Sequence, residues 1–183
     1  MAAFMFRSLM AVFVRKRIQT LMLQSLVPIH TSRLSIRELA DDDLEPVFDT
    51  LRPETSGGRV FEKKTISEAE RWLHNRMAEQ SELGYSIWGI ENENADFVGV
   101  CGLIPWKPVP MICYAVRNCH QGNGYGTEAA RAVLERTVGE FGSVISTIRS
   151  SNAASIRVAE KIGMRVSETS FSDDRTLRSF IYP

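Results

Sequence analysis

The chain of 183 residues is 44% hydrophobic and 24% charged, and its formal net charge is zero. This composition is typical of one soluble globular domain whose core needs neither disulfides nor a metal. The zero net charge and the lack of a long basic stripe argue against nucleic acid as a partner.

The first 37 residues contain no acidic side chain. Their basic residues are Arg7, Arg15, Lys16, Arg17, Arg33 and Arg37. The apolar run before Arg15 is too short to span a bilayer, and its charges follow the apolar part, the reverse of a secretory signal. We therefore expect a basic, acid-poor extension over 1–28, one domain over 29–183, and a cytoplasmic protein. A transit peptide to an organelle and a membrane-surface or partner helix are the alternatives.

The first half of the domain combines helices with strands. The aspartates at 41–43 are expected to cap the first helix, and acids in the first turn of the second helix favour its start. Residues 52–64 are irregular, and the polar stretch 92–96 is typical of a hairpin turn. The alternation and spacing of apolar residues predict strands at 33–39, 85–91, 97–104 and 111–117 and helices at 42–51 and 67–80.

The second half continues with a glycine-rich loop and alternating elements. Asn152 is expected to cap a helix that ends at Gly163. The full set is a helix over 124–140, a strand over 144–148, a helix over 152–163, and strands near 165–170 and 176–182. The chain is therefore α/β, with a mixed, mainly antiparallel sheet flanked by helices.

The loop from Gln121 to Thr127 carries the strongest functional signal. Its glycines, Gly122, Gly124 and Gly126, lie between an apolar strand and a helix, where unpaired backbone N–H groups and the helix dipole favour an anion. A nucleotide P-loop is excluded because no lysine follows the last glycine. The GxGxG spacing and its late place in the chain exclude a dinucleotide fingerprint.

Two long motifs resemble the GCN5-related N-acetyltransferase (GNAT) superfamily. Residues 121–126 fit its Q/R-x-x-G-x-G/A signature, and residues 122–129 are similar to the form found in the ribosomal-protein N-terminal acetyltransferases (RimJ/RimL type). Residues 152–164 resemble the second motif of that branch, and residues 31–37 resemble its opening strand. The resemblance covers about 29–182 and implies a splayed sheet, acetyl-CoA as co-substrate and no metal.

The resemblance also implies which residues bind acetyl-CoA. The backbone near Val116 would pair with the pantetheine arm, which enters where the strand splays from the next one near 145–148. Amides of the loop would hold the diphosphate, and Lys161 could reach a phosphate as a point charge. The implied cofactor-binding residues are Val116, Gln121, Gly122, Asn123, Gly124, Tyr125, Gly126, Thr127, Asn152 and Lys161.

By the same resemblance, catalysis would be direct attack of an uncharged amine on the thioester. Ser155 would serve the departing thiolate, and Asn152 would bind pantetheine or an ordered water. The simpler interpretation is that Asn152 is only an N-cap and Ser155 only the third residue of the helix. His120 adjoins the loop and is expected near the diphosphate rather than at the acetyl group.

The chain departs from the family pattern at two positions. Ala159 stands where many members have a tyrosine acid, and Met111 stands where many relatives have a glutamate that could act as a base. Glu54, Glu62 and Asp96 are the acids whose segments could supply a replacement, although each fits a solvated surface position as well.

The remaining titratable residues do not indicate a metal site. The histidines His30, His74 and His120 and the cysteines Cys101, Cys113 and Cys119 lack metal-ligand spacing. The cysteines lie in or beside expected strands, so we expect buried, unpaired thiols.

The resemblance implies that the acceptor is a primary amine, either a protein N-terminus or a small molecule, and we expect no membrane span. The branch allows a homodimer. Rival interpretations are a CoA-binding sensor or docking module without turnover, an enzyme for another acyl-CoA with a wider pocket near Cys113 and Ile148, and an interaction role for the basic leader.

Overall fold

The computed structural model describes residues 26–53 and 62–183. Within these stretches the chain forms one eight-stranded sheet in the order β1-β2-β3-β4-β5-β6-β8-β7, and every neighbouring pair is antiparallel except β5–β6. The strands are β1 (Ile29–His30), β2 (Leu34–Arg37), β3 (Ile87–Asn92), β4 (Phe97–Ile104), β5 (Met111–Val116), β6 (Val144–Arg149), β7 (Arg165–Val166) and β8 (Leu177–Tyr182).

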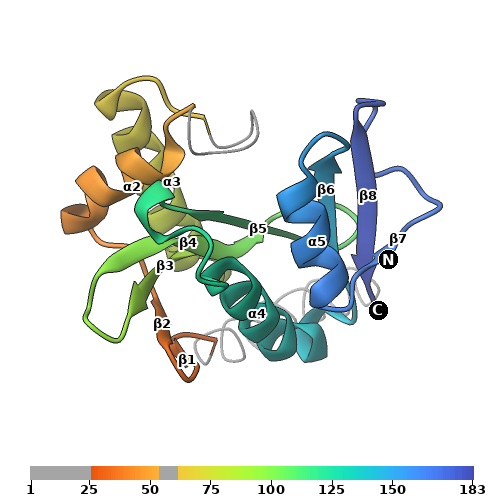
Figure 1. Ribbon diagram of the computed structural model, residues 1–183, viewed down its shortest axis with the longest axis horizontal. Coiled ribbons are helices and arrows are strands. Elements are labelled where there is room, and N and C mark those ends of the chain that lie inside the picture. The colour runs from red at the N-terminus through yellow and green to blue at the C-terminus, as the bar shows by residue number, and fades with distance from the viewer. Residues whose placement is uncertain (1–25, 54–61) are drawn as a thin grey trace, which may run out of the picture.

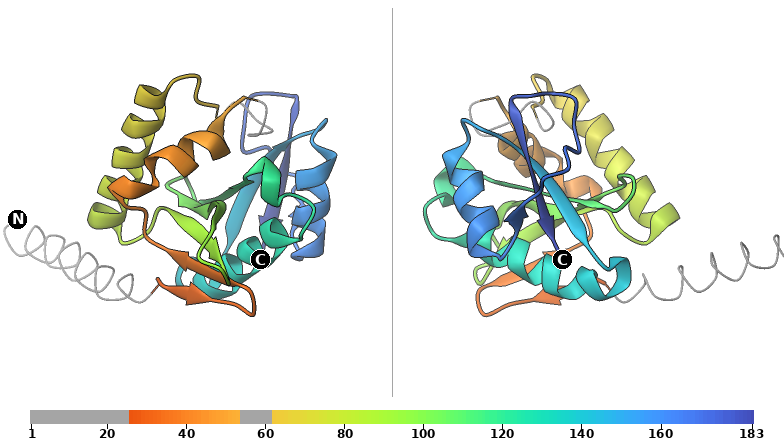
Figure 2. Two further views of the ribbon diagram at one scale, coloured as in Figure 1. Left: turned by 60° about the vertical axis from the view of Figure 1, so that its left-hand side comes forward. Right: turned by 90° about the vertical axis from the view of Figure 1, so that its right-hand side faces the viewer.

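Helices cover both faces of the sheet (Figures 1 and 2). They are α2 (Leu44–Leu51) and α3 (Ile66–Leu83) on one side and α4 (Tyr125–Phe141) and α5 (Ala153–Lys161) on the other, with 3-10 turns η1 (Asp41–Asp43) and η2 (Asn118–His120). None of the helices in the described stretches is both long and apolar enough to cross a bilayer.

The alternation of side chains along β5 builds a core on each face. Met111, Cys113 and Ala115 pack with α2 and α3, whereas Ile112 and Tyr114 pack in the cluster that includes α4 and α5. A strand with both faces buried is expected at the centre of a sheet. This placement of Tyr114 brings a phenol to the face that carries the glycine loop.

The sheet splays between β5 and β6, as the family resemblance implies. The two strands share a single registered pair, Met111 with Ile145, and the Ser146 hydroxyl donates weakly to the Ile112 carbonyl at 3.4 Å. Figure 1 shows β6 and β8 standing apart from β3, β4 and β5. The end of β5 nearest the glycine loop therefore pairs with β4 on one side and has no neighbouring strand on the β6 side.

Most expected elements are confirmed with shifts of a few residues, but the strand predicted over 165–170 is wrong beyond Val166. Side chains of the following segment bind its own backbone: Thr169 N–H donates to Ser167 Oγ at 3.1 Å, and Asp174 N–H donates to Ser172 Oγ at 3.1 Å. Such local bonds compete with a strand ladder, so the segment forms turns.

The predicted cap of the first helix is also wrong in detail. The aspartates form a 3-10 turn before α2, and no side chain caps α2 itself. The Asp43 carboxylate instead accepts the Ala40 N–H at 2.9 Å and pairs with the Arg37 guanidinium at 2.7 Å. A buried carboxylate favours this charged partner over a helix terminus.

Candidate functional site

The glycine loop holds a row of backbone donors at the start of α4. Gly122 and Gly124 have φ values of +82° and +81°, which residues with a Cβ rarely adopt. In the part of the chain that the structure describes, the N–H groups of residues 122–126 donate to no protein acceptor. The first intrahelical bonds come from Thr127 and Glu128, whose N–H groups both donate to the Gly124 carbonyl at 3.1 Å.

A cavity of about 380 Å³ lies between this loop, β5 and the first turns of α5. Gly126 permits close approach, because a Cβ there would lie 3.3 Å from Val116 Cγ2. The cavity is lined by Tyr114, Ala115, Val116, His120, Gln121, Gly122, Gly124, Tyr125, Gly126, Thr127, Asn152, Ala154, Ser155 and Val158. The two sequence motifs thus face one space.

Asn152 and Ser155 meet at the start of α5. Asn152 Oδ1 accepts the Ser155 N–H at 3.0 Å, so the expected N-cap is confirmed. Both residues also line the cavity, so the capping interpretation and the functional one are compatible.

Several predicted binding residues occupy distinct positions. Gln121 turns its amide back to the strand and donates to the Val116 carbonyl at 3.0 Å. His120 lines the cavity beside the loop. Asn123 and Lys161 are exposed and lie outside the cavity lining; the Lys161 carbonyl accepts a bond from Arg131 at 2.8 Å. Their roles remain predictions.

None of the residues that line this cavity carries a carboxylate. Of the acids considered as a base, Glu54 lies outside the described residues, and Glu62 is partly exposed and absent from the lining. Asp96 is exposed and accepts a bond from Asn92 in the β3–β4 turn at 2.9 Å.

The cysteines follow the buried pattern only in part. Cys101 and Cys113 are buried, and burial raises the pKa of the Cys113 thiol to about 12, so it stays protonated at neutral pH. Cys119 is exposed, which corrects the expectation of burial. It lies in the η2 turn, beyond the end of β5, where the chain has left the core.

Tyr114 is a cavity residue that the sequence analysis missed. Its hydroxyl donates to the Ser155 carbonyl at 3.1 Å, which ties β5 to the first turn of α5. Burial raises the pKa of this phenol, so it remains a donor at neutral pH. The alternation along β5 could have located it, because every second residue of that strand faces α4 and α5.

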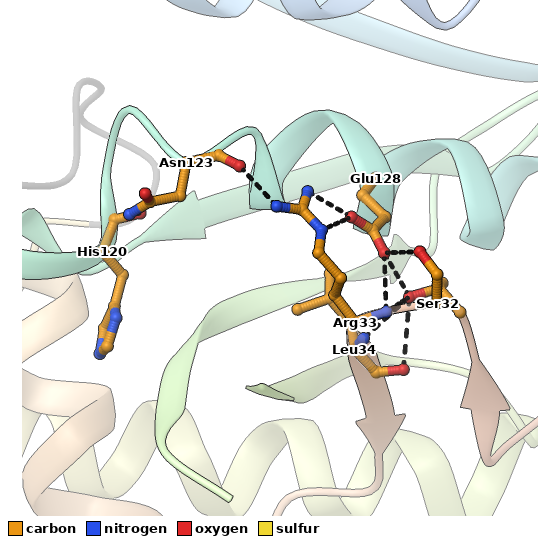
Figure 3. A network of polar contacts seen from close by, with 7 residues as sticks. Ser32, Arg33, Leu34, His120, Asn123 and Glu128 are labelled. Atoms are coloured by element: carbon orange, nitrogen blue, oxygen red, sulfur yellow. Dashed lines mark hydrogen bonds and ion pairs between the residues drawn. The ribbon is translucent and has the colours of Figure 1, made fainter. Parts of the chain in front are cut away.

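Glu128, in the first turn of α4, has partners that the sequence did not predict. Figure 3 shows Arg33, just before β2, reaching up to this carboxylate, with the ring of His120 pointing away. Arg33 Nε and Nη2 donate to Glu128 Oε2 at 2.8 and 2.5 Å, and Thr31 donates to Oε1 at 2.6 Å. No spacing in the sequence signals such a long-range pair.

These features fit acetyl-CoA. A cradle of unpaired N–H groups suits a diphosphate, and the open edge of β5 suits the amide-bearing pantetheine arm, which can pair as an extra strand does. When bound, acetyl-CoA supplies the activated acetyl thioester.

Comparison with known proteins agrees with the geometry. A family model described as "Acetyltransferase (GNAT) domain" matches residues 33–165. The chain is 34% identical over 147 residues to the uncharacterized protein YkkB of Bacillus subtilis (strain 168), covering 76% of this chain and 86% of that protein.

Solved structures share the fold. An acetyltransferase from Agrobacterium tumefaciens str. C58 has a TM-score of 0.73 at 23% identity, covering 86% of this chain and 95% of that one. RimL, a ribosomal L7/L12 alpha-N-protein acetyltransferase in complex with CoA, has a TM-score of 0.68 at 15% identity, covering 83% and 94%. The chain therefore belongs to the GNAT acetyltransferase family and is an acetyl-CoA-dependent N-acetyltransferase.

Proposed function

We propose that the protein acetylates a primary amine, either a protein N-terminus or a small-molecule amine, by direct attack on the thioester. The observation that carries the proposal is the shared cavity, which joins the unpaired N–H groups of the glycine loop to Asn152 and Ser155. The amine nitrogen forms the new C–N bond, the C–S bond breaks so that CoA leaves as the thiolate, and the nitrogen gives up its proton to water. The Ser155 hydroxyl then donates to the departing thiolate.

The acceptor would approach beside the final hairpin. A second cavity of about 1120 Å³ lies between the β4–β5 connection and the segment before β8. Its lining includes the aromatic side chains Trp106 and Phe171, one cation, Lys107, and two carboxylates, Asp173 and Asp174. Aromatic faces with nearby carboxylates suit an ammonium group, so this surface supports a cationic acceptor.

The described lining of the cavity between the glycine loop and α5 includes no carboxylate that could take the proton of the amine. A protonated amine needs a proton acceptor before it can attack. Binding of acetyl-CoA and turnover of the amine must therefore be measured separately.

Calorimetry with acetyl-CoA tests the site. Gly126→Glu places a carboxylate in the cavity at a position without positive φ, so it avoids the strain that Gly124 would impose. We expect tight binding by the wild type and none by this variant. Gly139→Glu, at an exposed position of the same helix with open space around it, should bind normally. Folded wild-type protein that binds neither acetyl-CoA nor CoA would contradict the proposal.

A screen of amines and N-terminal peptides tests turnover. Ser155→Ala should lower kcat about a hundredfold if the hydroxyl serves the thiolate, with acetyl-CoA affinity unchanged. Ser151→Ala, in the exposed turn before α5, is the matched control. Binding of acetyl-CoA without acetylation of any amine in the screen would contradict the proposed acceptor class.

A further inference from the structure

Arg33 connects two parts of the fold that lie far apart in the sequence. Its Nε and Nη2 groups pair with Glu128 on α4, and its Nη1 group donates to the backbone carbonyl of Asn123 in the glycine loop at 3.1 Å (Figure 3). Its guanidinium also lies over the Tyr125 ring, 5.0 Å from the centroid. One side chain therefore contacts the loop, the helix start and an aromatic ring.

The bond to the Asn123 carbonyl fixes the direction of a neighbouring donor. The peptide between Asn123 and Gly124 is trans, since the described cis bonds lie elsewhere. A trans peptide points its C=O and its N–H in opposite directions. With the carbonyl held towards Arg33, the Gly124 N–H points away from Arg33; Gly124 lines the cavity and Asn123 does not.

The pairing of Arg33 with Glu128 also offsets a negative charge close to the expected anion site. A carboxylate in the first turn of α4 would repel a diphosphate at the same helix end. Here both of its oxygens are occupied, because Oε2 accepts from Arg33 and Oε1 accepts from Thr31, from Ser32 at 3.3 Å and from the Arg33 N–H at 3.2 Å.

We infer that Arg33 is a positioning residue for the diphosphate-binding loop: it holds the Asn123 carbonyl on the outer side and thereby presents the Gly124 N–H to the cofactor. Lysine cannot replace it, because only the planar fork of arginine reaches the carboxylate and the carbonyl together. This inference rests on the acetyl-CoA site of the proposed function and adds a residue from outside both sequence motifs.

NMR titrations with CoA and with pantetheine, which lacks the diphosphate, test the inference. Arg33→Lys keeps the charge beside Glu128 but loses the fork. We expect its Kd for CoA to rise about tenfold, the loss of one charge-assisted hydrogen bond, with the Kd for pantetheine within about twofold of wild type. Equal affinity of Arg33→Lys and wild type for CoA would overturn the inference.

Arg37→Lys is the matched control. Arg37 ends β2, the strand that Arg33 precedes, and is paired just as closely, with Asp43 and Glu91, but none of its described bonds reaches the loop. We expect this variant to bind both ligands as the wild type does. Thermal melts establish that each variant is folded. A rise in the Kd for CoA in the control as large as in Arg33→Lys would attribute the effect to general loosening and overturn the inference.

A double variant separates peptide orientation from charge. Arg33→Ala combined with Glu128→Gln removes both the cation and the carboxylate that it neutralises. If Arg33 acts by orienting the Gly124 N–H, the affinity of the double variant for CoA stays low. If Arg33 acts only by neutralising Glu128, the affinity for CoA recovers, and this result would count against the inference.

The Gly124 amide proton gives the most direct readout. We expect saturating CoA to move it downfield in the wild type but not in Arg33→Ala. A different result is that Arg33→Ala binds CoA more weakly than the wild type and still shows the full downfield shift of the Gly124 amide proton at saturation. That result would mean that Arg33 contacts the cofactor itself, and it would overturn the positioning role. A wild type that binds no CoA would instead refute the proposed function.

Discussion

At the scale of single residues, the site combines groups with different origins. Asn152 and Ser155 come from a contiguous motif, whereas Tyr114 on β5 and Arg33 just before β2 reach the same region from elsewhere in the chain. The first pair could be identified from the sequence because its members are three residues apart on one helix. The second pair depends on tertiary packing, which brings residues 41 and 95 positions apart into contact.

Tyr114→Phe tests the link between β5 and α5. Loss of one hydrogen bond from a mostly buried hydroxyl should lower the free energy of unfolding by about 1 kcal/mol. Because the bond holds the turn that carries Ser155, kcat should fall while the Kd for CoA stays within about twofold. Denaturant unfolding and steady-state kinetics measure the two effects. The half-buried Tyr182 on β8 provides the control, Tyr182→Phe, and equal kcat values for both variants would count against a role for Tyr114.

At the scale of elements, the strands pack closely because glycines remove side chains where backbones meet. A Cβ on Gly102 of β4 would lie 2.2 Å from the Ser86 carbonyl oxygen and 2.6 Å from Ile87 Cα. Neither backbone atom can move without displacing β3. The close approach is thus a property of the strand pair.

Gly102→Ala should therefore destabilise the protein by about 3 kcal/mol, at the upper end of the cost of overpacking. Gly139→Ala is the opposite case: this helix residue has open space around it, so alanine should stabilise α4 by about 0.5–1 kcal/mol. Chemical denaturation compares the two. A neutral effect of Gly102→Ala would show that β3 and β4 separate more easily than their contacts indicate.

The sequence predicted the elements where periodicity was strong and failed where side chains bind their own backbone. The helix over 124–140 and the strand over 97–104 were placed within a residue or without error. The strand expected over 165–170 has only two residues, because serine, threonine and aspartate side chains form turns after it. The Asp43 carboxylate, expected to cap the first helix, pairs with Arg37 and the Ala40 N–H instead. Propensity favours a strand or a cap but does not record these competing hydrogen bonds.

At the scale of the whole molecule, the pair Arg33–Glu128 joins the edge of the sheet near β2 to α4. Burial opposes ionisation of Glu128, but hydrogen bonds from Thr31 and Arg33 outweigh it, so its pKa lies below the ordinary value near 4.5. The ionised form is the one that the fold stabilises. Its contribution is present above that ordinary value and is lost as the pH falls through the lowered pKa.

The difference in unfolding free energy between the wild type and Glu128→Gln should therefore be constant from neutral pH down to about 4.5 and then shrink. Urea unfolding at a series of pH values measures it. Glu135→Gln, at an exposed position of α4, controls for the loss of a charge from that helix. A difference that grows towards acid pH would reverse the sign of the linkage and contradict the described pairing.

The single registered pair between β5 and β6 makes the stability of the folded enzyme sensitive to a ligand bound beside β5. The sheet consists of two groups of strands, β1–β5 and β6–β8, which are paired with each other only through the short β5–β6 contact. A co-substrate that binds the folded chain but not the unfolded one would stabilise the fold by mass action, by about 2.7 kcal/mol at a hundred times its Kd. The lifetime of the folded enzyme would then follow the supply of its own acyl donor.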